Sequence, residues 1–149
     1  MLKMLKLNNI SAIGIDTKTE KFNTCNENGA EFSVSPMEND LKNKIADFSK
    51  SNDLDVVIDF VSSKSSLELG CSILGKGGRL VTLGGSGEQF LANSADMLVK
   101  ELELIGSRYC TKQELKESLD LYARGLIEPL VSVKTDFDGA EGLHDKIEK

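Results

Sequence analysis

Short apolar runs alternate with segments of helical period along almost the whole chain, and this alternation predicts an α/β fold. Five apolar runs predict strands, at Ala12–Ile15, Phe32–Val34, Val56–Val61, Arg79–Leu83 and Leu104–Ser107. The third run is apolar on both faces, which is typical of an interior strand with helices on both sides of the sheet. Since the crossovers read as helices, the sheet should be parallel.

The helical segments have recognisable start and stop signals. Pro36 and Thr111 stand where two helices should begin, and Gly29 and Gly125 stand where two should end. The helices are expected at Thr17–Asn28, Met37–Ser49, Ser65–Leu74 and Lys112–Arg124. A short strand at Leu130–Lys134 and a helical turn from Gly139 should follow.

The first apolar run ends at Asp16, and Lys21 follows five positions later. A carboxylate at the end of such a strand can accept hydrogen bonds from both hydroxyls of a nucleotide ribose. Two simpler interpretations stay open: Asp16 caps the next helix, and Lys21 is a solvated helix residue. The glycine-rich turn that should precede this strand is absent, because Met1–Asn9 contains no glycine.

Other candidate groups favour structural roles. The run Gly84–Gly87 follows a strand without a clear helix start behind it, so a tight strand exit that admits a flat ring is favoured over a phosphate loop. The serines at 62, 63, 65 and 66 are expected to supply a helix cap. His144 and three scattered cysteines form no recognisable zinc site, so no metal ligand or catalytic residue is assigned.

Composition narrows the class of protein. The 149 residues carry a net charge of −6 with basic residues interspersed among acids, which argues against nucleic acid as a partner. No run of eighteen apolar residues occurs, so no membrane partner is expected. Cys25, Cys71 and Cys110 fit reduced thiols, and a cytoplasmic location is expected.

Successive pieces of the chain resemble the cofactor domain of zinc-type alcohol dehydrogenases, in the medium-chain dehydrogenase/reductase family. The pieces are AIGIDTKTEK, NENGAEFSVSP, DVVIDFVSS, SSLELGCSILGKGGRLVTLGG and ELELIGSRYCTKQELKESLDLYARGLIEPLV. The resemblance covers nearly the whole chain. It implies a doubly wound, mainly parallel Rossmann-type sheet, a nicotinamide cofactor as hydride carrier, and a separate domain that holds zinc.

The resemblance also assigns roles to residues. Asp16 would hold the ribose hydroxyls with Lys21 beside them, which implies NAD because an acid there repels the extra phosphate of NADP. Phe60 and Val61 would line the adenine side of the site.

On the nicotinamide side, Leu83 and Gly84 would pass beneath the ring, and the backbone of Ser107 and Tyr109 would meet the carboxamide. The segment Gln89–Ser107 resembles the edge through which such domains pair, so a homo-oligomer is expected.

The chain departs from the family pattern at both ends. Residues 1–10 look like the end of the first Rossmann helix, residues 11–109 carry the sheet, and residues 110–149 lead toward a catalytic domain that has no counterpart here. The first strand and its GxGxxG turn are missing, although that strand lies between those ending at Asp16 and Val61. Either the flanking strands close on each other, or another chain supplies the strand.

Three functions therefore stand open. The chain is the NAD-binding portion of an alcohol dehydrogenase, not catalytic by itself and with zinc bound only by the complete enzyme. Alternatively, it is a non-catalytic nucleotide-binding module or an inactive gene remnant. The residues that choose the substrate would belong to the absent domain.

Overall fold

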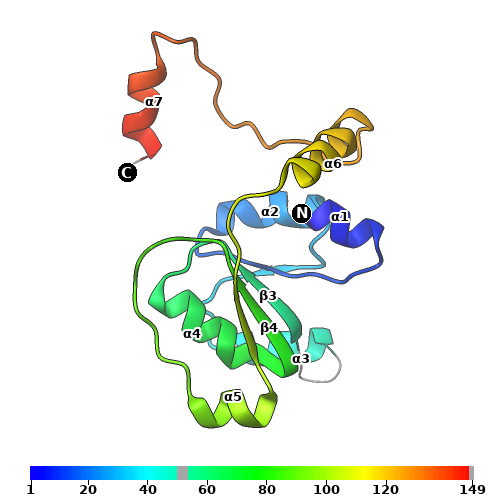
Figure 1. Cartoon of the computed structure of the whole chain (residues 1–149), viewed down its shortest axis with the longest axis vertical. Helices are drawn as coiled ribbons and strands as arrows, with labels where there is room; N and C mark the ends of the chain where they lie inside the picture. The colour runs from blue at the N-terminus through cyan, green and yellow to red at the C-terminus, as the bar shows by residue number, and fades with distance from the viewer. Residues whose placement is uncertain (50–53, 148–149) are drawn as a thin grey trace.

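Helices and strands alternate through residues 1–49 and 54–147, which the computed structural model describes (Figure 1). The helices are α1 (Leu2–Leu7), α2 (Phe22–Glu27), α3 (Leu41–Ser49), α4 (Lys64–Ile73), α5 (Ser94–Lys100), α6 (Lys112–Ala123) and α7 (Ala140–Ile147), with a 3-10 turn η1 (Thr19–Lys21) before α2. The strands are β1 (Gly14–Ile15), β2 (Ser33–Val34), β3 (Leu54–Asp59), β4 (Leu74–Thr82) and β5 (Glu103–Gly106). None of these described helices combines the length and apolar composition needed to cross a bilayer.

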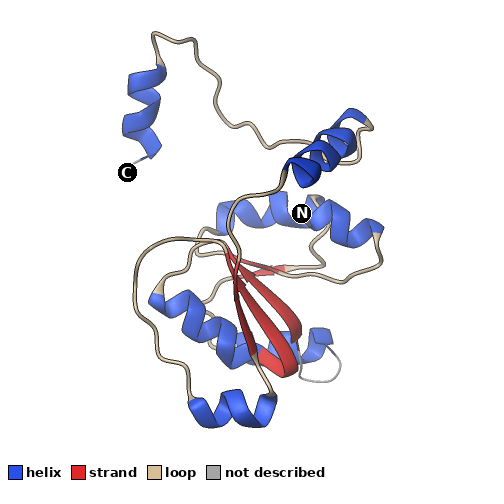
Figure 2. Ribbon diagram, in the orientation of Figure 1, coloured by secondary structure: helices blue, strands red, loops and turns tan. Residues whose placement is uncertain are grey.

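The strands form two separate parallel sheets, which confirms the predicted strand direction (Figure 2). In the smaller sheet β1 pairs with β2, and in the larger sheet β4 lies between β3 and β5. Among the described residues β1 and β3 are not paired, so the strands on either side of the expected missing strand do not close on each other.

Hydrophobic side chains join the two sheets. Val34 of β2 is buried in one cluster with Leu41 and Ile45 of α3 and Ile73 of α4. Ile13 before β1, together with Leu54 and Val57 of β3, packs against this cluster, so both sheets border the same core. A second cluster around Leu67, Leu74 and Leu80 fixes α4 on the larger sheet. Burial of these side chains is the main contribution that holds the two sheets as one body.

Two helix caps form where the sequence predicts them. The Ser63 side chain caps α4 by accepting a hydrogen bond from the Ser66 amide. Thr111 and Glu114 form a reciprocal capping box on α6, and hydrogen bonds from Thr111 lower the pKa of Glu114. Gly125, with φ of +69°, follows the end of α6.

Four local predictions are wrong. The helix expected from Met37, after Pro36, begins only at Leu41, because residues 36–40 form turns. Residues Leu130–Lys134 form no strand: they run through an exposed irregular segment with no neighbouring strand to pair with. Helix α5 was not predicted, although Asn93 caps it through the Ala95 and Asp96 amides. Strand β4 begins at Leu74 instead of Arg79, where the strand was expected, and so includes the glycines between them. A register shift between Leu54 and Val56 of β3 absorbs the extra residues.

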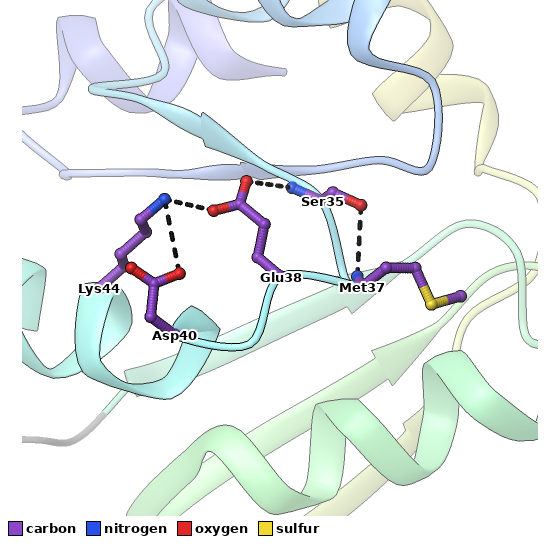
Figure 3. A network of polar contacts seen from close by, with 5 residues as sticks. All are labelled: Ser35, Met37, Glu38, Asp40 and Lys44. Carbon is purple, nitrogen blue, oxygen red and sulfur yellow. Dashed lines mark hydrogen bonds and ion pairs between the residues drawn. The ribbon is translucent and has the colours of Figure 1, made fainter.

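A polar network fixes the connection from β2 to α3 (Figure 3). Glu38 accepts hydrogen bonds from the Ser35 amide and from the Lys44 ammonium group, and Lys44 also lies 3.7 Å from Asp40. The Lys44 contact, followed by the Ser35 amide, holds the pKa of Glu38 below its usual value. The network directly follows Val34, the residue whose carbonyl accepts a hydrogen bond from the Asp16 amide.

Glu38→Gln should therefore weaken the pH dependence of stability. A carboxyl whose pKa is lowered by folding stabilises the protein above its unfolded pKa, near 4.5, and this contribution is lost as the pH falls through the folded value. The melting temperature of the variant should lie below that of the native chain at neutral pH, and the difference should shrink at acidic pH. Glu27→Gln, an exposed change on α2, is the control; a difference that is constant with pH would contradict the prediction.

Candidate functional site

Asp16 directly follows β1, at the carboxyl end of a parallel strand. Its backbone amide donates to the Val34 carbonyl at 3.3 Å, and one carboxylate oxygen, Oδ1, accepts from the Lys18 amide at 2.9 Å. The other oxygen, Oδ2, lies 3.4 Å from the Lys21 ammonium group. The carboxylate thus closes a tight turn rather than capping a helix, and it keeps free acceptor capacity beside a cation.

Asp59 organises the end of β3, and the sequence analysis missed it. The whole Asp59 residue is only 7% exposed. Its Oδ1 atom accepts from the amides of Val61 (2.8 Å) and Ser62 (3.0 Å), and its Oδ2 atom accepts from the Ser66 hydroxyl at 2.7 Å. The one available signal was an acid inside an apolar strand, since an acid buried there must be hydrogen-bonded. These bonds fix the backbone that carries Phe60 and Val61.

The end of β4 is pressed against the end of β3. The Leu83 amide donates to the Asp59 carbonyl at 2.8 Å. A Cβ atom built on Gly84 would lie 2.5 Å from the Val61 carbonyl oxygen and 2.8 Å from that of Phe60. Only glycine allows this approach, which brings the predicted adenine-side and nicotinamide-side residues into contact.

The segment after β5 joins the same edge of the sheet. The Ser107 amide donates to the Thr82 carbonyl of β4 at 2.9 Å. Tyr109 has φ of +58° and an exposed ring, with the Arg108 guanidinium 4.5 Å from the ring centroid. Ser107 thus lies in backbone contact with β4, whereas the Tyr109 side chain contacts its neighbour.

The site residues therefore fall into two groups. Phe60, Val61, Leu83, Gly84 and Ser107 gather at the carboxyl ends of adjacent strands of the larger sheet, whereas Asp16 and Lys21 follow the smaller sheet.

A groove of about 270 Å³ runs past the exposed ring of Phe60. Asn28 at the end of α2 and the first residues of the chain line it together with Phe60. The end of β3 thus lies beside the start of α1 and the end of α2, the helices that come before and after β1.

The described residues fit one part of a dinucleotide better than another. Asp16 and the exposed side chains of Phe60 and Val61 suit an adenosine. The run Gly84–Gly87 leads into an irregular segment before α5, so it forms no glycine-rich turn at a helix N-terminus.

No metal site appears among the described side chains, where no three of Cys, His, Asp and Glu gather. Burial, the larger effect, raises the pKa of the Cys71 thiol, and the charge of Lys100 opposes it. The net rise disfavours the thiolate that a metal requires.

Gly84→Ala should destabilise the protein, because the new Cβ must displace backbone atoms of Phe60 and Val61. A loss of about 1–3 kcal/mol in the free energy of unfolding is expected from urea denaturation. Gly85→Ala is the matched control: a Cβ there meets no atom within 4 Å, so its effect should stay within about 0.5 kcal/mol. Equal losses in the two variants would contradict the close approach.

Comparison with known proteins places this geometry in context. Residues 1–124 match the family described as zinc-binding dehydrogenase. An NAD-dependent alcohol dehydrogenase of Sulfurisphaera tokodaii is 23% identical over 136 residues, which are 91% of this chain and 39% of the relative. One of Sulfolobus acidocaldarius is 26% identical over 139 residues, covering 92% of this chain and 39% of the relative.

Solved structures show the same fold. The alcohol dehydrogenase of Aeropyrum pernix superposes with a TM-score of 0.86 at 24% identity, over 99% of this chain and 42% of that protein. An alcohol dehydrogenase of Escherichia coli CFT073, solved with NADH, gives 0.85 at 23% identity over 99% and 44%. The chain spans about two fifths of the length of these relatives. It belongs to the family of zinc-binding dehydrogenases and has the fold of part of an alcohol dehydrogenase.

Proposed function

We propose that this chain is the NAD-binding portion of an oxidoreductase that transfers hydride between an alcohol or aldehyde and NAD. The observation that carries the proposal is the Asp16 carboxylate at the carboxyl end of β1, with the Lys21 ammonium group 3.4 Å away. Two relatives named as NAD-dependent alcohol dehydrogenases support the choice of cofactor.

Asp16 would recognise the adenosine ribose. Lys18 and Lys21 occupy part of the acceptor capacity of its carboxylate, and the remaining lone pairs can accept from two ribose hydroxyls. A ribose that carries a 2′-phosphate would place a second anion against this carboxylate, so NAD should bind in preference to NADP.

The ends of the larger sheet would hold the rest of the cofactor. Phe60 and Val61 present exposed apolar side chains that can cover one face of the adenine. Leu83 and Gly84 would pass beneath the nicotinamide, and the backbone of Ser107 and Tyr109 would face its carboxamide. Asp59 acts as a positioning residue, because its three hydrogen bonds fix the turn that carries Phe60 and Val61.

The catalytic step would require polypeptide beyond these 149 residues. Bound NAD supplies the hydride acceptor, and zinc in the complete enzyme would polarise the alcohol oxygen. We propose that residues 1–149 contribute cofactor binding and orientation, without the metal and without proton transfer. A cytoplasmic location stays a prediction.

Calorimetric titration of the full 149-residue chain with NAD tests the proposal. We expect a dissociation constant in the millimolar range, because contacts to the pyrophosphate are missing. Asp16→Ala should weaken binding by about tenfold or more, the effect of losing charge-assisted hydrogen bonds, and should reduce the preference over NADP.

Asp120→Ala, which removes an exposed acid of α6 that pairs with Arg124, should leave the affinity unchanged. Absence of heat at millimolar NAD would overturn the proposal. The interpretation that would then remain is that of an inactive gene remnant. Heat that is unaffected by Asp16→Ala would refute the role assigned to this carboxylate.

A further inference from the structure

The segment between β4 and α5 runs beside α4 without forming a helix or strand (Figure 1). Its residues 84–92 are called the strap here. Among the described residues, no backbone amide or carbonyl of the strap forms a hydrogen bond with another backbone group. A segment without backbone pairing opens easily unless side chains hold it. The position of the strap is therefore set by side-chain contacts.

Glu88 connects the strap to the first turn of α4. Its Oε2 atom accepts a hydrogen bond from the Lys64 amide at 2.7 Å. Lys64 is the first residue of α4, so its amide is one of those that a helix leaves without an internal partner, and the Ser63 cap satisfies the Ser66 amide instead. A carboxylate at this place is favoured by the helix dipole and by the charge of the bond. Glu88 thus caps α4 from 24 residues away.

Ser86 connects the Glu88 contact to the edge of the sheet. Its hydroxyl accepts a hydrogen bond from the Glu88 amide at 3.2 Å and donates one to the Ser62 carbonyl. Ser62 is buried, and its own amide donates to the Asp59 carboxylate at 3.0 Å. The contacts of the strap therefore continue into the turn after β3, the same turn against which Gly84 lies.

The second half of the strap is attached farther along α4. The Leu91 amide donates to Oε1 of Glu68 at 3.3 Å. The Phe90 side chain packs against the buried cluster that includes Leu67. These contacts fix the part of the strap that leads to α5, whereas Ser86 and Glu88 fix the part that follows the glycines at the end of β4.

We propose that Glu88 is a positioning residue for the cofactor, because its bond to the Lys64 amide keeps the strap on α4 and thereby keeps Gly84 and Gly85 in place beneath the nicotinamide. The inference rests on the proposed function. Gly84 is held by the end of β3, but a Cβ atom built on Gly85 would meet no atom within 4 Å, so no neighbour on that side holds this residue. Without the Glu88 bond a smaller fraction of molecules keeps this conformation, and the affinity for NAD falls by that fraction.

Amide hydrogen exchange by NMR on the full 149-residue chain tests the Glu88 contact without any ligand. In Glu88→Ala the Lys64 and Leu91 amides should exchange about tenfold faster or more, because the strap leaves α4. Glu88→Gln should restore part of the protection, since the side-chain amide oxygen still accepts a hydrogen bond but carries no charge. Gln89→Ala, which changes the next exposed residue of the strap, is the matched control and should leave both rates unchanged.

Titration with NAD and with ADP-ribose, which lacks the nicotinamide, separates positioning from a purely structural role. Glu88→Ala should weaken NAD binding by about three- to tenfold and leave ADP-ribose binding unchanged, because only the nicotinamide end depends on the strap. Glu88→Gln should lose less of the NAD affinity, and Gln89→Ala none. In the native chain NAD, but not ADP-ribose, should shift the amide signals of Gly84 and Gly85.

Unchanged exchange of the Lys64 amide in Glu88→Ala would overturn the proposal, and so would equal losses of affinity for the two ligands. A native chain that binds neither ligand would refute the proposed function and, with it, the role of Glu88 toward the cofactor. The exchange rates would still decide whether Glu88 holds the strap, so the two failures are distinguishable.

Discussion

The structure depends on the packing of Val34, Leu41, Ile45 and Ile73, because no backbone hydrogen bond among residues 1–49 and 54–147 joins the two sheets that border this cluster. In a continuous sheet, ladder hydrogen bonds fix the distance and register between neighbouring strands. Within the described residues, side-chain packing sets the position of β1 relative to β3. Packing is less directional than hydrogen bonding, so this junction is the place where the two halves of the site can shift.

This constraint divides the site into a rigid and a less rigid part. Two separate sets of contacts fix the backbone around Phe60 and Gly84. These are the hydrogen bonds to the buried Asp59 carboxylate and the close backbone approach of β4 to β3. Asp16 is held by the smaller sheet, by the Lys18 amide of its own turn and by the exposed Lys21 ammonium group. Surface ion pairs such as the one with Lys21 contribute about 0–1 kcal/mol. The distance between Asp16 and Phe60 therefore depends on the packing of the buried cluster around Val34. In the proposed function, the ribose contact at Asp16 is therefore the more sensitive half of the site, since a misplacement of about 1 Å weakens recognition.

The features that could be predicted from the sequence are those that local signals determine. Periodicity located the strands, and cap residues such as Ser63 and Thr111 marked helix starts, because each signal acts within a few residues. The failures depend on distant partners. Leu130–Lys134 has strand composition but no strand beside it. The glycines after Leu74 stay within β4 because Leu74 and Arg79, on either side of them, pair with Leu54 and Val56 of β3. The role of Asp59 was not predicted for the same reason. Its carboxylate fixes the turn after β3 through partners such as the Ser66 hydroxyl, which lies seven residues later in the sequence.

The affinity expected in the proposed function is limited by the contacts that Asp16 can make. Two charge-assisted hydrogen bonds to a ribose contribute about 3–6 kcal/mol in total, and millimolar affinity already requires about 4 kcal/mol after the entropy cost of association. Asp16 alone therefore cannot hold NAD tightly. In the proposed site, tight binding would also need the contacts at Phe60 and Gly84, so the side-chain packing that sets the distance between Asp16 and Phe60 would limit the affinity for NAD.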